Sequence, residues 1–121
     1  MKNVIANKSY AFAIRIIRLY KFLSEEKKEF VLSKQLLRSG TAVGALVKEA
    51  EHAQSKADFL NKMNIALKEA NETEYWLMLL KDTEYISIKE FESINEDCLE
   101  ILRLLISIVK STKTSINRQT N

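Results

Sequence analysis

"LLRSGTAVGALVKEAEHAQS", residues 36–55, contains both glycines of the 121-residue chain, Gly40 and Gly44. A glycine inside a helix costs about 1 kcal/mol relative to alanine, yet the apolar residues of this segment have the three/four spacing of an amphipathic helix. Both glycines fall on the apolar face, beside Val43 and Val47. Because small residues let another backbone approach closely, the spacing predicts a tight helix contact, within a bundle or between subunits. A kink or local break at the glycines is the alternative.

The composition indicates one helical domain. The chain has no proline and only two glycines, so turn-forming residues are scarce and long helices are favoured over strands. No apolar run approaches the ~18 residues that span a bilayer, and residues 1–12 lack the features of a signal peptide. A single cysteine, Cys98, excludes an internal disulfide and is typical of a reducing cytoplasm. We therefore expect a cytoplasmic protein that does not enter a membrane.

Apolar periodicity predicts four helices, over residues 8–25, 31–53, 56–84 and 88–111. Two of them begin with a serine followed three residues later by a carboxylate, Ser55 with Asp58 and Ser87 with Glu90, the pattern of a capping box. Short connections make successive helices antiparallel neighbours. The predicted fold is an all-α, up-down-up-down four-helix bundle over residues 1–113, with a disordered polar tail over 114–121.

The first and fourth helices are more apolar than a lone bundle requires. From Tyr10 to Leu23 the only charges are Arg15, Arg18 and Lys21, and from Cys98 to Val109 the strongly polar side chains are Glu100, Arg103 and Ser107. A helix that is apolar nearly all round is usually buried on several sides. We therefore expect these two helices to bury additional surface between subunits of a homo-oligomer.

Charge is unevenly distributed along the chain. Residues 1–48 hold ten Lys/Arg and three Asp/Glu, a net +7; residues 49–100 hold five and thirteen, a net −8; residues 101–121 hold four and none, a net +4. This pattern fits solvated helix faces, a polyanion site on the basic half, or charge-matched contacts between subunits. The candidate nucleic-acid contacts lie in stripes on the first two helices: Lys8, Arg15, Arg18, Lys34, Arg38 and Lys48.

Enzymatic and metal chemistry find little support. Glu49 and His52 have the helical spacing of a carboxylate di-iron motif, but such a site needs two of these motifs and the chain has one histidine. We expect no metal, no cofactor and no catalytic residue, with His52 at a helix end. Cys98 lies in an apolar seam and is predicted to be a buried, inert thiol.

Aromatic and acidic residues of the third helix have two interpretations. Tyr75, Trp76 and Tyr85 could stack on bases, but helical spacing favours packing at the end of the bundle. Glu74 falls within the apolar arc and should need a partner, for which a contact across a subunit interface is one candidate.

Residues 8–81 resemble the small four-helix bundle family encoded by intervening sequences within bacterial 23S ribosomal RNA genes. The resemblance is carried by Arg38-Ser39, Gly44, Glu49-Ala50, Ser55, Asp58-Phe59, Lys68-Glu69-Ala70, Glu72-Thr73 and Tyr75-Trp76-Leu77. Two positions depart from the family pattern, since Ala42 stands where a serine is usual and Leu46 where an asparagine is usual.

The resemblance implies a ring-shaped homopentamer. It also implies nucleic-acid binding, since a related branch, the accessory protein of diversity-generating retroelements, is a basic pentameric barrel that binds nucleic acid and a reverse transcriptase. Our first hypothesis is a non-enzymatic homopentamer that binds RNA or DNA, with a reverse transcriptase as a candidate protein partner. The second is a protein-interaction module without nucleic-acid binding. The two differ in whether the basic stripes stay exposed or are covered by acids such as Glu69 and Glu72.

Overall fold

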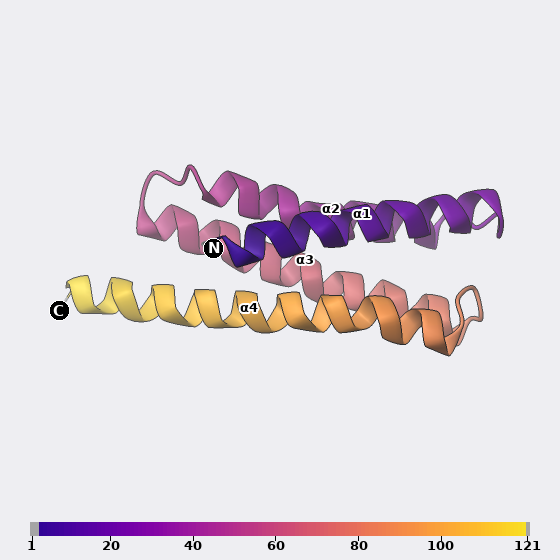
Figure 1. Ribbon diagram of the computed structural model, residues 1–121. Coiled ribbons are helices and arrows are strands. Elements are labelled where there is room, and N and C mark those ends of the chain that lie inside the picture. The colour runs from indigo at the N-terminus through magenta and orange to yellow at the C-terminus, as the bar shows by residue number, and fades with distance from the viewer. Residues whose placement is uncertain (1–2, 121) are drawn as a thin grey trace.

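The computed structural model describes residues 3–120, which form four helices and no strand. The helices are α1 (Val4–Glu25), α2 (Leu32–Ala50), α3 (Lys56–Asp82) and α4 (Ile88–Thr120), and each runs antiparallel to the next (Figure 1). The structure thus confirms the predicted all-α four-helix bundle. None of the helices in the described range is both long and apolar enough to cross a bilayer.

The largest difference from the sequence-based boundaries is at the end of the chain. The prediction of a disordered tail is wrong for residues 114–120, because α4 continues to Thr120. Residue 121, the last of the predicted tail, lies outside the described residues. No glycine or proline interrupts this segment, and the Thr112 hydroxyl donates to the Ile108 carbonyl at 2.7 Å. Lys56 Nζ, at the start of α3, also donates to Ser115 Oγ at 2.6 Å. Figure 1 shows α4 running past the other three helices at this end.

The other boundaries differ by a few residues. α1 begins at Val4 instead of residue 8, since Ile5 is already buried in the core. α2 ends at Ala50 instead of residue 53, and α3 ends at Asp82 instead of residue 84.

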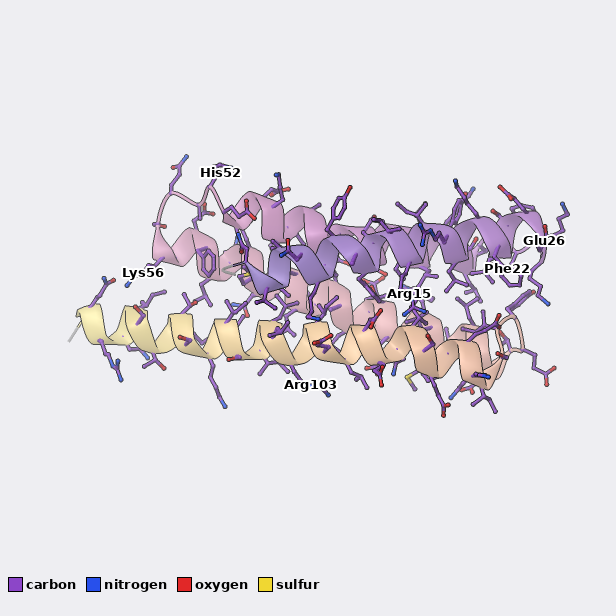
Figure 2. All side chains as sticks on the ribbon, viewed as in Figure 1. Arg15, Phe22, Glu26, His52, Lys56 and Arg103 are labelled. Atoms are coloured by element: carbon purple, nitrogen blue, oxygen red, sulfur yellow. The ribbon has the colours of Figure 1, made fainter. Side chains whose placement is uncertain are left out.

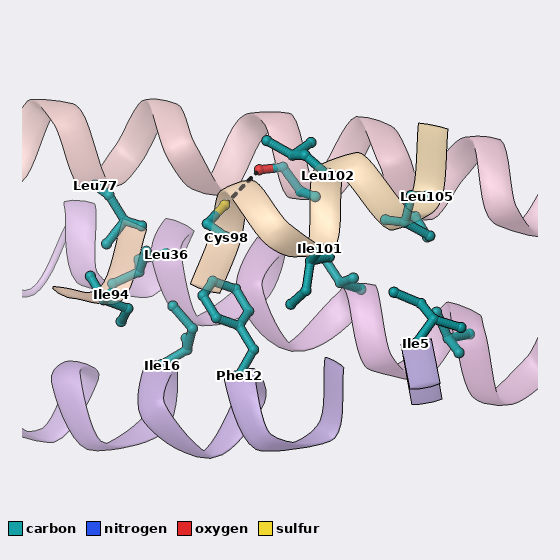
Figure 3. Packing of buried hydrophobic residues seen from close by; sticks show 14 of the residues in the cluster. Ile5, Phe12, Ile16, Leu36, Leu77, Ile94, Cys98, Ile101, Leu102 and Leu105 are labelled. Atoms are coloured by element: carbon teal, nitrogen blue, oxygen red, sulfur yellow. Dashed lines mark hydrogen bonds between the residues drawn. The ribbon is translucent and has the colours of Figure 1, made fainter. Parts of the chain in front are cut away.

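All four helices contribute to one hydrophobic core. Figure 3 shows Leu36 of α2, Leu77 of α3 and Ile94 of α4 gathered beside Ile16 of α1, with Phe12 one turn away along α1, level with Cys98. The apolar seams of α3 and α4 face this core, as the periodicity predicts. Their buried members include Met63, Ala66, Ala70, Thr73, Leu77, Leu80, Ile94, Cys98, Ile101 and Leu105.

The glycine pair of α2 packs against α1 inside the bundle. A Cβ atom added at Gly40 would lie 2.8 Å from Cγ1 and Cγ2 of Ile16, and one added at Gly44 would lie 3.3 Å from the backbone oxygen of Ser9. Because α2 is continuous from Leu32 to Ala50, the structure confirms the close helix contact and not the kink.

The predicted capping boxes start α3 and α4. Ser55 Oγ accepts from the Asp58 N–H at 3.0 Å, although Asp58 returns the bond one residue early, to the Gln54 N–H at 3.2 Å. The Ser87 and Glu90 pair is fully reciprocal, at 3.0 and 2.8 Å. Both helices therefore begin where the sequence signals predict.

The connections use no glycine. Lys28, between α1 and α2, has φ 56°, and Glu84, between α3 and α4, has φ 68°, so both occupy the left-handed region. Glu29 follows Lys28 and caps α2 from outside the helix. Its carboxylate accepts from the backbone N–H groups of Leu32 at 2.9 Å and Ser33 at 2.7 Å.

The bonds that Glu29 accepts change its acidity. Burial favours its protonated form, but these hydrogen bonds outweigh burial and lower the pKa of Glu29 below its ordinary value of 4.5. The ionised carboxylate therefore stabilises the entry into α2.

Candidate nucleic-acid interface

Two of the three candidate cations on α1 form ion pairs with α4. Arg15 lies between the two helices (Figure 2), where its Nη1 donates to Asp97 Oδ2 at 2.7 Å and its Nη2 donates to Ser93 Oγ at 2.9 Å. Lys8 pairs with Glu100 at 3.2 Å. The side chain of Arg18 is exposed and has no ion-pair or hydrogen-bond partner within residues 3–120.

On α2, Arg38 is held by two acids of α3. It donates to Glu69 Oε1 at 3.1 Å and also to Glu72. The hydrogen bond with Glu72 is the main cause that raises the pKa of Arg38, and the hydrogen bond from Arg38 is the main cause that lowers the pKa of Glu72. Lys34 and Lys48 are exposed, and neither side chain has a partner in the described part of the chain.

The basic stripes are therefore divided. Lys8, Arg15 and Arg38 face carboxylates of the same subunit, whereas Arg18, Lys34 and Lys48 do not. These pairs join the basic N-terminal half to the acidic segment 49–100, so part of the charge asymmetry serves contacts within one subunit.

A second set of cations lies on α4, in the segment 101–120, which contains no acid. Its members are exposed and lack a side-chain partner among residues 3–120: Arg103, Lys110, Lys113 and Arg118. The sequence gives residues 101–121 a net charge of +4, but none of these cations was among the predicted contacts, and residues 114–121 were expected to form a disordered tail. The absence of acids after Glu100 is the signal that could have identified it.

Apolar side chains remain exposed on α1 and α4. On α1 they follow helical spacing at Tyr10, Ile14 and Ile17, with Tyr10 71% exposed; on α4 they are Leu99 and Ile106. The contact between α1 and α4 is also the least extensive of the four helix contacts. The apolar character noted in the sequence therefore does reach the surface of the single subunit.

Near the start of α4, a groove of about 670 Å³ separates α4 from α1. Its lining combines the cations Arg15 and Arg18 with Leu19, Phe22 and Ile94. The groove between α1 and α2 is smaller, about 270 Å³.

Of the residues considered for metal or thiol chemistry, Glu49 forms an ion pair, His52 is exposed, and Cys98 is buried. Glu49 pairs with Lys62 at 2.9 Å, and His52 lies exposed just beyond α2, as predicted. No group of three metal-ligating side chains occurs among residues 3–120. Burial raises the pKa of Cys98 to about 12, and its thiol donates to the Ala70 carbonyl at 3.5 Å (Figure 3). The prediction of a buried, inert thiol agrees with this environment.

The aromatic residues mostly pack. Trp76 and Tyr85 lie against the core, and the Trp76 indole N–H donates to Glu72 Oε2 at 3.1 Å. Tyr75 is different, since it is exposed and meets Trp76 edge to face with centroids 5.1 Å apart.

Glu74 finds its partner within the subunit. Its Oε2 accepts from Nδ2 of Asn95 on α4 at 3.2 Å. The partner expected for Glu74 is therefore supplied by the neighbouring helix α4 and requires no subunit interface.

The fold and the charged surface define a small helical bundle protein of the kind that the sequence resembles. The family model described as "23S rRNA-intervening sequence protein" matches residues 1–107, and the chain belongs to this family. Among solved structures, the chain is similar to a protein of unknown function from the S23 ribosomal protein family of Bacteroides thetaiotaomicron VPI-5482. The two are 67% identical with a TM-score of 0.88, over 89% of this chain and 96% of that one. None of the curated proteins compared with the chain matches it.

Proposed function

We propose that this protein is a non-enzymatic, homo-oligomeric bundle that binds RNA or DNA through its basic surface. The observation that carries the proposal is the exposure of Arg18, Lys34 and Lys48 without an acid partner in the described chain. The paired cations can contribute too, since exposed ion pairs are worth only about 0–1 kcal/mol and a phosphate can replace the carboxylate.

The assembly that we propose is the ring-shaped homopentamer implied by the family. The exposed apolar residues of α1 and α4 support self-association, because Tyr10, Ile14 and Ile17 share one face of α1 and neighbouring exposed apolar side chains often mark an interface. Light scattering coupled to gel filtration should give a species larger than a dimer. Replacing Ile14 and Ile106 by glutamine should reduce its size without loss of helicity. A 14.0 kDa species for the unaltered chain at micromolar concentration would contradict the proposal.

Nucleic-acid binding can be tested by its salt dependence. Fluorescence anisotropy with short RNA and DNA should show binding that weakens steeply between low and physiological salt. Each phosphate contact contributes about 0.7 to 0.9 to the log–log slope, so the Lys34→Gln, Arg38→Gln, Lys48→Gln variant should flatten it by about two to three. Unchanged slope in this variant would exclude the α2 stripe and move the site to other cations.

The second candidate is a protein-interaction module that does not bind nucleic acid, with a reverse transcriptase as one candidate partner. It is favoured by Arg38, whose guanidinium is already engaged by Glu69 and Glu72 in the middle of the α2 stripe. Absence of RNA and DNA binding at low salt would support this function and exclude the first.

A further inference from the structure

The C-terminal part of α4 is a continuous helix with a basic surface. Its helix continues from residue 107, where the family match ends, to Thr120. Lys56 Nζ donates to Ser115 Oγ and so ties this part of α4 to the start of α3. The cations of the segment are therefore held on a defined helical surface, which lowers the entropy cost of binding a ligand there.

Helical geometry places three of these cations on one face. At 100° per residue, Lys110 lies within about 20° of Arg103, and Arg118 within about 60°. With a rise of 1.5 Å per residue, the successive separations along α4 are about 10 and 12 Å. Figure 2 shows Arg103 pointing away from the rest of the bundle. Lys113 lies at the edge of the same face.

The surroundings of these cations favour a polyanion over an acidic protein. Ile106 is the one exposed apolar side chain between Arg103 and Arg118, and beyond it every exposed side chain up to residue 119 is polar, including Ser107 and Ser111. Protein interfaces usually contain an apolar or aromatic centre, whereas nucleic-acid interfaces are polar and strongly positive. Arginine and lysine with neighbouring hydroxyl groups are typical phosphate contacts.

We propose that the face formed by Arg103, Lys110, Lys113 and Arg118 binds the phosphate backbone of a nucleic acid. The inference rests on the proposed nucleic-acid function and assigns it a surface separate from the α1 and α2 stripes. Because the contacts are to phosphate, binding at this face does not depend on base sequence.

The experiment compares three variants of the full chain by fluorescence anisotropy, with a labelled mixed-sequence single-stranded RNA and a DNA duplex. The test variant is Lys110→Gln, Lys113→Gln, Arg118→Gln. The matched control removes the same charge from exposed lysines elsewhere, by Lys21→Gln, Lys68→Gln, Lys89→Gln. The third variant is the α2 triple described above. Glutamine and lysine have similar helix propensities, so circular dichroism should show unchanged helicity in all three.

The expected result is a log–log salt slope flatter by about two to three in the test variant, with the wild-type slope retained by the matched control. An unchanged slope in the test variant together with a flatter one in the α2 triple overturns this inference and leaves the proposed function standing. Equal loss in the test variant and the matched control also overturns it, since binding would then follow net charge alone. Absence of wild-type binding at low salt overturns both.

Discussion

The two sides of α1 are held in different ways. Toward α2, contact depends on the missing side chains of Gly40 and Gly44, because a Cβ atom at either position would crowd Ile16 or Ser9 of α1. Toward α4, polar contacts such as Arg15 with Asp97 span a surface that opens into a groove of about 670 Å³. The difference shows that helices adjacent in the sequence pack closely, whereas the first and last helices, α1 and α4, make the least extensive contact. The exposed apolar residues do not follow this division, because Tyr10 lines the smaller groove between α1 and α2.

The largest expected effect on stability comes from adding a side chain between α1 and α2. Gly44→Leu places a Cβ atom 3.3 Å from the backbone oxygen of Ser9, tighter than an ordinary contact, and adds a longer side chain beyond it, so α1 must give way. Overpacking of this kind costs about 1–3 kcal/mol, and we expect the upper end, with Tm lower by on the order of 10 °C. Thermal unfolding followed by circular dichroism measures it.

The matched control is Ala45→Leu, one residue further on and exposed. It should leave Tm nearly unchanged. Equal melting temperatures for Gly44→Leu and the wild type would show that the glycine contact has no packing role.

A smaller loss of stability is expected at low pH, at the connection between α1 and α2 where Glu29 caps α2. The folded pKa of Glu29 lies below 4.5, so its stabilising contribution is complete above that value and is lost as pH falls through the folded pKa. At pH 7, Glu29→Gln should lower the unfolding free energy by about 1 kcal/mol, because a charged cap of α2 is lost. This difference should shrink at pH 3, as measured by denaturant titration at both pH values.

Glu26→Gln is the control, since Glu26 is exposed in the same connection. It should change the unfolding free energy little at either pH. A deficit for Glu29→Gln that stays constant between pH 7 and pH 3 would argue against the capping role of the ionised carboxylate.

The smallest effect on stability is expected between α1 and α4. A double-mutant cycle with Arg15→Gln and Asp97→Asn should give a coupling energy of about 0.5 kcal/mol, since the pair is exposed. It should fall in 1 M salt because exposed charges are screened, whereas the effect of Gly44→Leu should not. A coupling energy of several kcal/mol would mean that the contact of α1 with α4 contributes as much to stability as its contact with α2.

Local signals allowed most of the fold to be predicted. Ser55 and Ser87 mark the starts of α3 and α4 because capping depends on residues three positions apart. The glycine spacing likewise predicted a close contact, although the partner helix could not be named. The end of α4 was missed because its polar sequence has no hydrophobic period, and its helix is supported by the contact of Lys56 with Ser115, which lie 59 residues apart.

The candidate site was less predictable. Spacing places Arg38 on a basic face of α2, but its pairing with Glu69 and Glu72 depends on how α2 and α3 are rotated about their axes. The same holds for Glu74, whose partner Asn95 comes from a different helix. Charge along the sequence identifies which residues are available, and only the packed bundle shows which of them are already paired.

The distribution of glycine has a consequence for how this sequence tolerates change during evolution. Left-handed backbone at Lys28 and Glu84 costs about 1 kcal/mol relative to glycine, so a glycine gained at either turn is a favourable change. A glycine lost at position 40 or 44 brings a side chain against α1. Sequence drift is therefore permissive at the turns, where glycine is usually constrained, and restrictive in the middle of a helix, where it is usually replaceable.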